Sequence, residues 1–400
     1  MEIYQPAEDS YLLQRFVSRH AYGRVLDVGT GSGVQAITAI KNPQVREVVA
    51  IDLSAEAVGV FEQKVQKQKL RKIKVLQSDL FEEISGYFNV IIFNPPYLPQ
   101  DKGIRDDAIY GGKKGWEISE RFFREVSNHL FPEGMILFLF SSLTNKQKIE
   151  EILYHNMLGW EELGEEKIAF ETLYVYKITK TSLLRQLEGK LLRDIHYFAE
   201  GKRGVVYTAH SDKSKLVKSH FPAKKEIFRV AIKVKKKESK AEDAIASEAR
   251  WLKALNKQGI GPRFLFSEEE YVVYEFVEGE YIEDWLPKAS PEAVKKVLIE
   301  VFEQCFILDQ MKVNKEEMHN PSKHIIINAK NMPALIDFER CYETEKPHNV
   351  TQFVDFIGKQ QKLLLKKGFA FLPEALREAA ARYKGKYAAP VFEEIIGLLD

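Results

Sequence analysis

An apolar strand that stops abruptly at two prolines constrains this chain more than any other feature. The run Phe88–Phe93 is typical of a buried strand, and the segment Asn94-Pro95-Pro96-Tyr97 follows it at once. Proline cannot continue a central strand, and Pro95 favours an extended backbone at Asn94. The chain is therefore held stiff at the carboxyl end of a strand, which is where open α/β sheets bind their ligands.

This corner carries groups that suit a planar nitrogen. The side-chain carbonyl of Asn94 and the backbone carbonyl of Pro95 can accept both hydrogens of an NH2 group. The ring of Tyr97 can stack on the flat face of the same group. We therefore predict that Asn94, Pro95 and Tyr97 are catalytic residues for an amide or aromatic amine whose nitrogen must become nucleophilic.

The composition is that of an ordinary globular protein, and it argues against several function classes. The 400 residues suggest two or three domains, and the formal net charge of +1 supplies no whole-chain field for nucleic-acid binding. The two cysteines, Cys305 and Cys341, argue against a disulfide framework and against a cysteine zinc site. The amino terminus does not resemble a signal peptide and no apolar run is long enough to cross a bilayer, so we expect a cytoplasmic protein without a membrane partner.

A glycine-rich turn between a strand and a helix precedes this corner. Residues 24–28 indicate a buried strand, the turn Gly29-Thr30-Gly31-Ser32-Gly33 follows, and residues 34–40 indicate a helix. Glycines allow a sharp turn and a close approach of the backbone to a ligand. The next strand, residues 47–51, ends in Asp52, whose carboxylate can bind a ribose hydroxyl pair. A NAD-binding Rossmann domain would share this pattern, but the Asn-Pro-Pro-Tyr segment favours S-adenosylmethionine as the cofactor.

Further segments of the first half complete a predicted α/β sheet. The strand 74–77 leads to Asp79, which either accepts a hydrogen bond from an adenine amino group or caps a helix that begins at Phe81. The cationic segment 110–116 is predicted to be a lid over the substrate, or else a solvated turn. We also expect a helix over 11–17 with Glu8 and Asp9 at its start, a helix over 117–130, and strands over 135–140 and 170–178, the last of which closes the sheet.

The second half, which we separate near residue 181, shows another pattern. A polar helix over 183–193 is expected to join the halves, and Gly201 and Gly204 indicate a hairpin folded over phosphates. Lys233 belongs to an expected strand over 229–234, and Glu248 to a helix from which it could pair with that lysine. A strand over 334–339 carries Asp337, a carboxylate that suits Mg2+.

Residues 1 to about 180 resemble the class I methyltransferases of the HemK group, in particular their archaeal and eukaryotic branch. The resemblance rests on four segments in order: Pro6-Ala7-Glu8-Asp9-Ser10, Asp27-Val28-Gly29-Thr30-Gly31-Ser32-Gly33, Asn94-Pro95-Pro96-Tyr97 and Gly111-Gly112-Lys113-Lys114-Gly115. It implies transfer of a methyl group from S-adenosylmethionine to the side-chain nitrogen of a glutamine in a translation termination factor. It implies that the cofactor is contacted by Glu8, Asp27, Gly29, Gly31, Gly33, Asp52, Leu53, Asp79, Leu80 and Asn94, and the glutamine by Asn94 and Tyr97.

The resemblance also implies a partner and leaves an alternative substrate open. Relatives of that branch usually work with a small zinc-binding activator subunit, so we expect such a subunit here unless the second domain replaces it. Adenine and guanine amino-methyltransferases also carry Asn-Pro-Pro-Tyr. A nucleic-acid base flipped into the same pocket is therefore the alternative acceptor.

Residues of about 190 to 360 resemble the protein kinase-like fold, especially the atypical lineages related to RIO kinases and to the small KEOPS-complex kinase. By this resemblance Asp337 chelates Mg2+, and ATP is bound by Gly201, Gly204, Lys233, Glu248 and Glu275. The segment 315–325 stands where the His-Arg-Asp catalytic loop is expected, so Glu317 would replace the catalytic aspartate. Lys323 or His324 falls where a second metal ligand is expected. Because of these departures, the domain either transfers phosphate or acts as a nucleotide-binding pseudokinase or scaffold.

Together these patterns predict a bifunctional chain with two domains. The first, residues 1–180, has an α/β fold with a Rossmann-like class I methyltransferase sheet, and the second, residues 181–400, is an α+β bilobal serine/threonine protein kinase-like domain. The lysine-rich region from Lys213 to Lys240 is interpreted as a solvated face, with contact to RNA or the ribosome as the alternative.

Overall fold

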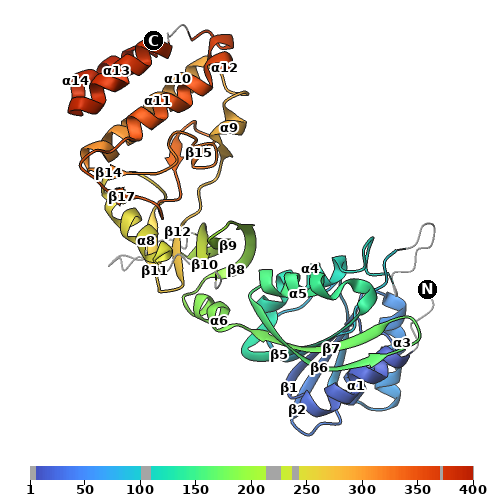
Figure 1. The fold of residues 1–400 in the computed structure, drawn as a ribbon. Coiled ribbons are helices and arrows are strands. Elements are labelled where there is room, and N and C mark those ends of the chain that lie inside the picture. Colours follow the sequence, from blue (N-terminus) through green and yellow to red (C-terminus); the bar gives the residue numbers. More distant parts are fainter. Residues whose placement is uncertain (1–5, 101–109, 213–226, 237–242, 370–372, 400) are drawn as a thin grey trace. The chain divides into compact units, whose positions relative to one another are not determined.

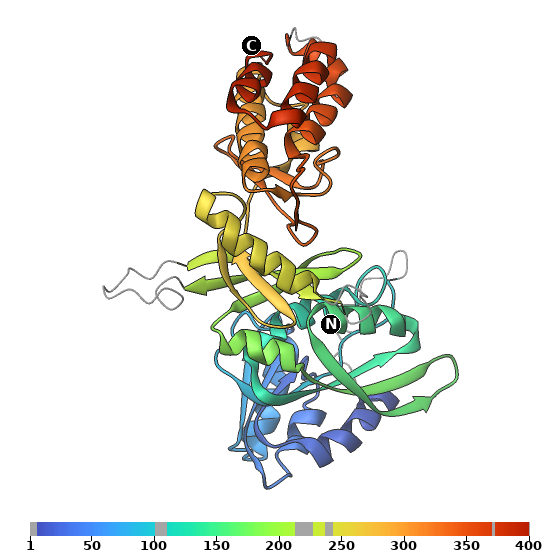
Figure 2. The ribbon, with the colours of Figure 1, turned by 60° about the vertical axis from the view of Figure 1, so that its left-hand side comes forward.

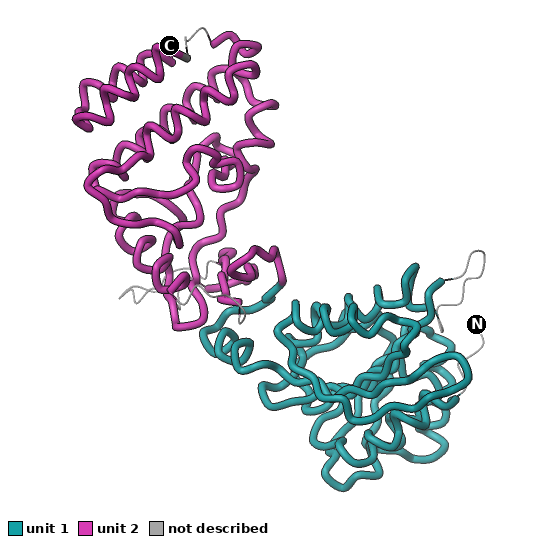
Figure 3. The backbone as a smooth tube through the Cα atoms, viewed as in Figure 1, with its two compact units in different colours: residues 1–196 teal, residues 197–400 magenta. Residues whose placement is uncertain are grey.

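The chain forms two compact units, Met1–His196 and Tyr197–Asp400 (Figure 3). The computed structural model describes residues 6–100, 110–212, 227–236, 243–369 and 373–399. Among these residues, no helix combines the length and the apolar character that a bilayer crossing requires.

The helix α6 (Ser182–Gly189) follows residue 181, where we place the domain boundary, and it is fixed to the first unit. The ammonium group of the buried Lys180 donates to both carboxylate oxygens of Glu188 at 2.7 Å and to the carbonyl of Ser127 at 2.8 Å. The helix predicted over 183–193 is shorter than expected, because α6 ends at Gly189 and a strand begins at Arg193. The boundary near residue 181 stays a prediction for the functional domains.

The first unit is built on a mixed sheet (Figure 1). Its strands, in spatial order, are β3 (Ile73–Gln77), β2 (Val45–Asp52), β1 (Gly23–Val28), β4 (Phe88–Phe93), β5 (Leu130–Ser141), β7 (Thr172–Lys180) and β6 (Leu158–Lys167). The strands from β3 to β5 pair in parallel, and β7 runs antiparallel to both β5 and β6. Parallel strands are covered on both faces, which explains why β1 and β4 are apolar runs.

The strand predicted over 170–178 does not form the edge of this sheet. The edge position belongs to β6, a strand that the sequence did not indicate. Most side chains of β6 are exposed or half-buried, and acidic residues predominate in its middle. An edge strand that is solvated on both faces lacks the apolar alternation by which strands are predicted.

Helices cover both faces of the sheet. Residues alternate along the central strands, so Val90 and Ile92 point into one core while Phe93 points into the other. The first core also contains side chains from α1 (Glu8–His20), α2 (Val34–Ala39) and α3 (Ala55–Lys67). The second is an aromatic cluster in which the ring of Phe122 of α4 (Glu117–Glu125) packs at a tilt against that of Phe93, and α5 (Lys146–His155) packs beside α4. The helix predicted over 117–130 is thus shorter, because a 3-10 turn, Val126–His129, follows α4.

The order of the strands reverses direction at β1. This strand pairs with β2 on one side and β4 on the other, so that Val28 lies opposite both Ile51 and Phe93. The segments that follow these three residues therefore emerge at one edge of the sheet. Such a switch point leaves a crevice outside the carboxyl ends of the strands, where ligands bind in open α/β folds.

The second unit contains a small sheet followed by a helical part. The strands of the sheet are β11 (Phe264–Ser267), β12 (Tyr271–Glu275), β10 (Ile227–Lys235), β9 (Gly204–Asp212) and β8 (Arg193–Glu200), in spatial order. The first residues of β8, up to His196, belong to the first unit. Figure 2 shows α8 (Ala244–Leu255) lying along this sheet. The helices are α9 (Ile282–Trp285), α10 (Pro291–Gln310), α11 (Asn349–Lys359), α12 (Gln361–Lys366), α13 (Pro373–Lys386) and α14 (Ala389–Gly397).

Short strands accompany these helices, one before α9 and the others between α10 and α11. They are β13 (Glu280–Tyr281), β14 (Val313–Asn314), β15 (Ile325–Ile327), β16 (Pro333–Leu335) and β17 (Tyr342–Glu343). The strand predicted over 334–339 thus ends at Leu335, and Asp337 lies in the loop that follows β16. The apolar core of this unit joins α8 to the helices through side chains such as Leu252, Phe302 and Phe353.

Candidate functional site

A cavity of about 650 Å3 opens at the carboxyl ends of β1, β2, β3 and β4. This volume is within the range of roughly 300–1,000 Å3 that small-molecule sites occupy. The sequence-predicted residues that line it are Asp27, Gly29, Gly31, Asp52, Leu53, Asp79, Leu80, Asn94, Pro95 and Tyr97. Glu8 is exposed at the start of α1, and neither Glu8 nor Gly33 is among the lining residues.

The glycines of the turn after β1 have different roles. Gly29, Gly31 and Gly33 all have positive φ angles, of 63°, 50° and 78°. A Cβ atom at Gly29 or Gly31 would meet no described atom within 4 Å, so the backbone there is open to a ligand. A Cβ atom at Gly33 would lie 1.9 Å from the ring of Phe61, so this glycine lets α2 pack against α3.

Asp27 is a buried carboxylate beneath that turn. Its Oδ2 accepts hydrogen bonds from the Thr30 hydroxyl at 2.7 Å and from the Ala36 backbone N–H at 3.1 Å. Burial raises the pKa of Asp27 to about 7, although these hydrogen bonds oppose the shift. The charge of Asp27 therefore changes near neutral pH, and a cationic ligand would favour its ionised form.

Asp52 ties the turn to the end of β2. Its Oδ2 accepts from the Gly31 N–H at 2.9 Å, and its Oδ1 accepts from the Ser54 N–H at 2.9 Å. The next side chain, Leu53, is 58% exposed and lines the cavity. Asp52 thus shapes the wall of the cavity, and its binding of a ribose stays a prediction.

Asp79 faces the cavity from the segment after β3. It forms an ion pair with Arg121 of α4, with 2.9 Å between Oδ2 and the guanidinium. Sequence reasoning missed Arg121, because only the fold brings α4 beside this segment. The residues after Asp79 form turns, so it does not cap a helix starting at Phe81. Leu80 follows with a positive φ of 49°.

The proline corner holds a buried, unsatisfied acceptor. Asn94 Nδ2 donates to Asp9 Oδ2 at 2.8 Å, whereas Asn94 Oδ1 has no hydrogen-bond partner among the residues that the structure describes. Asp9 is 4% exposed and lines the cavity together with Asn94 and Tyr97. The sequence placed Asp9 at a helix start and in one of the four segments of the family resemblance, but gave it no role at the site. No local signal connects it to a residue 85 positions away.

The glycine-rich segment 110–116 lies against this corner. The Gly111 N–H donates to the Leu98 carbonyl at 3.0 Å. A Cβ atom at Gly111 would lie 2.4 Å from the Pro96 carbonyl, and one at Gly115 would lie 2.5 Å from the Tyr97 carbonyl. These glycines therefore allow the segment to brace the backbone of the corner, which a solvated turn would not do. Its role as a lid stays a prediction.

The second unit gathers charged side chains around Lys233. The Lys233 ammonium group lies 2.5 Å from Glu248, 2.8 Å from Asp337 and 3.0 Å from Glu339. Burial opposes the charge of Lys233, but these three carboxylates hold its pKa well above the usual value. Burial also disfavours the Asp337 carboxylate, yet Lys233 keeps the pKa of Asp337 below its usual value.

A second group of side chains joins Asp337 to the segment that precedes β15. His324 lies 3.4 Å from Glu317 through Nε2 and 3.8 Å from Asp337 through Nδ1. Ligand atoms of these three residues lie within 4.8 Å of one another, a spacing that a metal ion could use. Lys323 is exposed, so His324 is the residue that reaches the place where a second metal ligand was expected. Glu317 and Asp337 both have positive φ angles, of 76° and 65°.

The other residues predicted to bind ATP surround the turn between β8 and β9 or end β12. The Gly201 N–H donates to the Gly204 carbonyl at 2.9 Å, which closes that turn. Arg203, between these glycines, forms an ion pair with Glu339 at 3.0 Å. Glu275 ends β12 and pairs with Arg263 at 3.0 Å.

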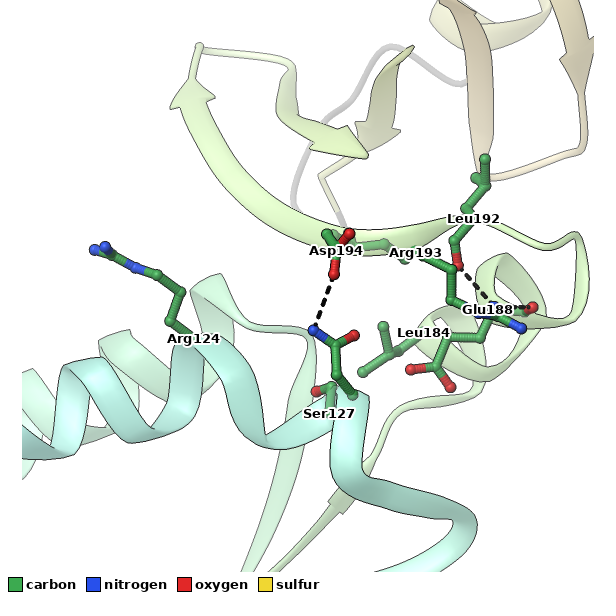
Figure 4. A pocket seen from close by; sticks show the side chains of 9 residues that line it. Arg124, Ser127, Leu184, Glu188, Leu192, Arg193 and Asp194 are labelled. Carbon is green, nitrogen blue, oxygen red and sulfur yellow. Dashed lines mark hydrogen bonds between the residues drawn. The ribbon is translucent and has the colours of Figure 1, made fainter. Parts of the chain in front are cut away.

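Two other features lie apart from these groups of charged side chains. A hollow of about 10 Å3 lies beside the hydrogen bond from Asn128 to Asp194 and has room for roughly one water molecule (Figure 4). The lysine-rich region from Lys213 to Lys240 is the other. Its residues 213–226 and 237–240 lie outside the described residues, and the rest forms β10 and its end.

Comparisons with known proteins agree with the geometry of the first unit. Residues 8–168 match the family model of the methyltransferase small domain. A protein of Methanocaldococcus jannaschii, inferred to be a protein N5-glutamine methyltransferase, is 36% identical over 181 residues, which are 44% of this chain and 90% of that relative. Human methyltransferase HEMK2 is 28% identical over 195 residues, which are 45% of this chain and 91% of the human protein.

Two further matches show how much of each chain is shared. The release factor glutamine methyltransferase of Deinococcus radiodurans is 36% identical over 123 residues, so this chain spans 44% of that relative's length. A solved structure of the E. cuniculi Mtq2-Trm112 complex, described as responsible for methylation of the eRF1 translation termination factor, aligns with 29% identity and a TM-score of 0.37. The alignment covers 45% of this chain and 100% of the matched chain.

The archaeal relative is more than one third identical and is covered almost completely, and the matched residues include the glycine turn and the proline corner that form the cavity. The amino-terminal part of this chain therefore belongs to the HemK-type family of S-adenosylmethionine-dependent protein N5-glutamine methyltransferases.

Proposed function

We propose that the first unit transfers a methyl group from S-adenosylmethionine to the side-chain nitrogen of a glutamine in a translation termination factor. The observation that carries this proposal is the buried Asn94 Oδ1, which has no partner among the described residues and belongs to a side chain lining the cavity. A buried acceptor left unpaired costs free energy, so it favours a ligand that donates hydrogen bonds. The name of the Deinococcus relative, a release factor glutamine methyltransferase, supports an amide as that donor.

The cavity fits S-adenosylmethionine in size and in polarity. It offers about 650 Å3, open backbone at Gly29 and Gly31, and the carboxylates of Asp27 and Asp52. S-adenosylmethionine, when bound, supplies a methyl group that is already activated by its positively charged sulfur. The protein therefore needs to bind and orient the two reactants rather than supply a strong electrophile.

The proline corner makes the amide nitrogen a better nucleophile. An amide nitrogen is weak because its lone pair is delocalised into the carbonyl group. Asn94 Oδ1 and the Pro95 carbonyl would accept both N–H bonds, which raises electron density on the nitrogen, while Tyr97 holds the plane of the amide. The amide nitrogen, oriented by Asn94, Pro95 and Tyr97, would use its lone pair to form the new N–CH3 bond, with the sulfur of the cofactor as the leaving group. Positioning of this kind contributes several kcal/mol, and the proton leaves after transfer, so no strong base is needed.

Labelled cofactor tests this proposal against the nucleic-acid alternative. The purified chain is incubated with methyl-labelled S-adenosylmethionine and, in separate reactions, with a termination factor, with RNA and with DNA. We expect label in the termination factor, and none when Asn94→Ala replaces the native chain. Label in RNA or DNA alone would instead favour methylation of a flipped base.

A small zinc-binding subunit is the proposed partner of the first unit. The proposal rests on the resemblance to the archaeal and eukaryotic branch. The same labelling reaction, run with and without such a subunit, tests it. A rate that does not change on addition of the subunit would contradict a need for this partner.

For the second unit we propose ATP- and Mg2+-dependent phosphoryl transfer by a kinase-like site. The proposal is supported by the buried cluster in which Lys233 contacts Glu248 and Asp337, and by the nearby Glu317 and His324. A lysine paired with a helix carboxylate is suited to bind phosphates, and the Asp337 carboxylate, which belongs to a group of side chains spaced for a metal ion, could bind Mg2+. Glu317 would then accept the proton of the attacking hydroxyl group.

Nucleotide binding and phosphoryl transfer are tested separately. We expect ATP with Mg2+ to raise the melting temperature of the native chain, and to do so less for Lys233→Met. Transfer of the labelled γ-phosphate that vanishes in Asp337→Ala would support the kinase-like site. Binding without transfer would instead favour a pseudokinase, and absence of binding would favour a scaffold.

A further inference from the structure

The side chain of Asn94 can be useful to the reaction in only one of its two orientations. A carboxamide has an oxygen that accepts hydrogen bonds and a nitrogen that donates them. The substrate amide presents hydrogens, so the oxygen of Asn94 must face it. If the carboxamide turned by half a rotation, it would present its own hydrogens and repel the substrate.

The structure contains a group that selects this orientation. Asp9 Oδ2 lies 2.8 Å from Asn94 Nδ2, and an ionised carboxylate can only accept hydrogen bonds. The NH2 end of Asn94 is therefore held toward Asp9, and Oδ1, which has no hydrogen-bond partner among the described residues, stays available as an acceptor. A hydrogen bond to a charged acceptor is stronger than one between neutral groups, and the burial of Asp9, 4% exposed, strengthens it further.

Asp9 is itself held in place by several contacts. Its Oδ1 accepts from the Ser10 N–H at 2.6 Å, in the first turn of α1, where a helix favours negative charge. The carbonyl of Ser10 accepts from Gln35 Nε2 of α2 at 2.8 Å. Gln14 of α1 donates to Thr38 of α2 at 2.8 Å, so two hydrogen bonds fix the first turns of α1 to α2.

We propose that Asp9 is a positioning residue of the methyl transfer, which locks the Asn94 carboxamide with its oxygen toward the substrate amide. This inference rests on the proposed function, because it takes Asn94 Oδ1 as the acceptor of the substrate N–H. Asp9 is not required to touch the substrate or to accept its proton. Its effect is on the rate of transfer rather than on the binding of S-adenosylmethionine.

Kinetics of two variants test the effect on rate. Asp9→Ala removes the lock, and we expect kcat to fall by roughly 10- to 100-fold, the range that loss of one charge-assisted hydrogen bond implies. The Kd for S-adenosylmethionine should stay within about threefold of the native value. Asp9→Asn keeps the shape but can donate as well as accept, so it should retain more activity than Asp9→Ala. The matched control is Arg19→Gln, an exposed position on the same helix, which should not change kcat.

Nuclear magnetic resonance tests the orientation itself, without any methyl acceptor. In protein labelled with 15N-asparagine, the side-chain signal of Asn94 is identified by its loss in Asn94→Ala. We expect its protons to exchange slowly with water in the native chain and at least tenfold faster in Asp9→Asn, while other asparagine signals stay unchanged.

The two measurements separate the possible failures. Unchanged kcat in both Asp9 variants, or unchanged exchange of the Asn94 amide, would overturn the positioning role. If the native chain methylates no termination factor, the proposed function fails, and the amide exchange still decides whether Asp9 locks Asn94. Should Asp9→Ala fail to fold, the isosteric Asp9→Asn carries both tests.

Discussion

The affinity of the first unit for S-adenosylmethionine should depend on pH through Asp27. This carboxylate is buried, and its pKa is raised to about 7 in the ligand-free protein. The cofactor is a cation, and by the family resemblance Asp27 contacts it, so the bound form needs the ionised carboxylate. Protonation of Asp27 weakens the Kd by the factor 1 + 10^(pKa−pH). With a pKa of about 7, this factor rises from about 1.1 at pH 8 to about 11 at pH 6. We therefore expect the Kd to weaken about tenfold between these pH values, which is about 1.4 kcal/mol.

Isothermal titration calorimetry checks this directly. Titrations at pH 6, 7 and 8, in buffers of different ionisation enthalpy, should give the Kd and the number of protons released on binding. Asp27→Asn is the control that removes titration of this group but leaves titration of the cofactor itself. If the native Kd changes with pH no more than that of Asp27→Asn, the reasoning about Asp27 is refuted.

The same shift sets the stability of the ligand-free protein. An acid whose pKa is raised by folding binds protons more strongly in the folded state. Its contribution to the free energy of unfolding is therefore fully present below about pH 4 and is lost as the pH rises to about 7. The difference between 3.8 and 7 corresponds to at most about 4 kcal/mol. Asp27→Asn should therefore unfold at a higher temperature than the native chain at pH 8, whereas a lower temperature would contradict the account.

Two further predictions concern packing in the first unit. Gly33→Ala should destabilise the unit by more than about 2 kcal/mol because its Cβ would overlap the ring of Phe61. Gly31→Ala has open space beside it and should cost only about 1 kcal/mol in backbone strain. Chemical denaturation compares the two variants, and equal losses of stability would contradict the geometry. Lys180→Ala should lower the free energy of unfolding by about 2 kcal/mol because it leaves the half-buried Glu188 carboxylate without its cation. A loss below about 1 kcal/mol would show that this pair does not fix α6.

Much of the first unit could be predicted from the sequence. The central parallel strands β1, β2 and β4 are mostly buried, and each was visible as a largely apolar segment that ends in a turn or a polar residue. Because parallel strands end at one edge of the sheet, the glycine turn, Asp52 and Asn94 were expected near one another, and all three line the cavity.

The features that the sequence did not show depend on tertiary contacts. Asp9 approaches Asn94, and Arg121 approaches Asp79, only after α1 and α4 pack onto the sheet. The strand β6 was missed because an edge strand with solvated faces has no apolar alternation. In the second unit, only the structure distinguished His324 from Lys323 as the neighbour of Asp337.

The central claim is that the proline corner delivers an amide nitrogen to the methyl group of S-adenosylmethionine. Tandem mass spectrometry of a termination factor after incubation with the native chain and with Asn94→Ala tests it most directly, with the Kd for the cofactor measured on both. The account predicts one added methyl group on a glutamine side chain with the native chain and none with the variant, at cofactor affinities within about threefold. Methylation of that glutamine by Asn94→Ala at the native rate would contradict it.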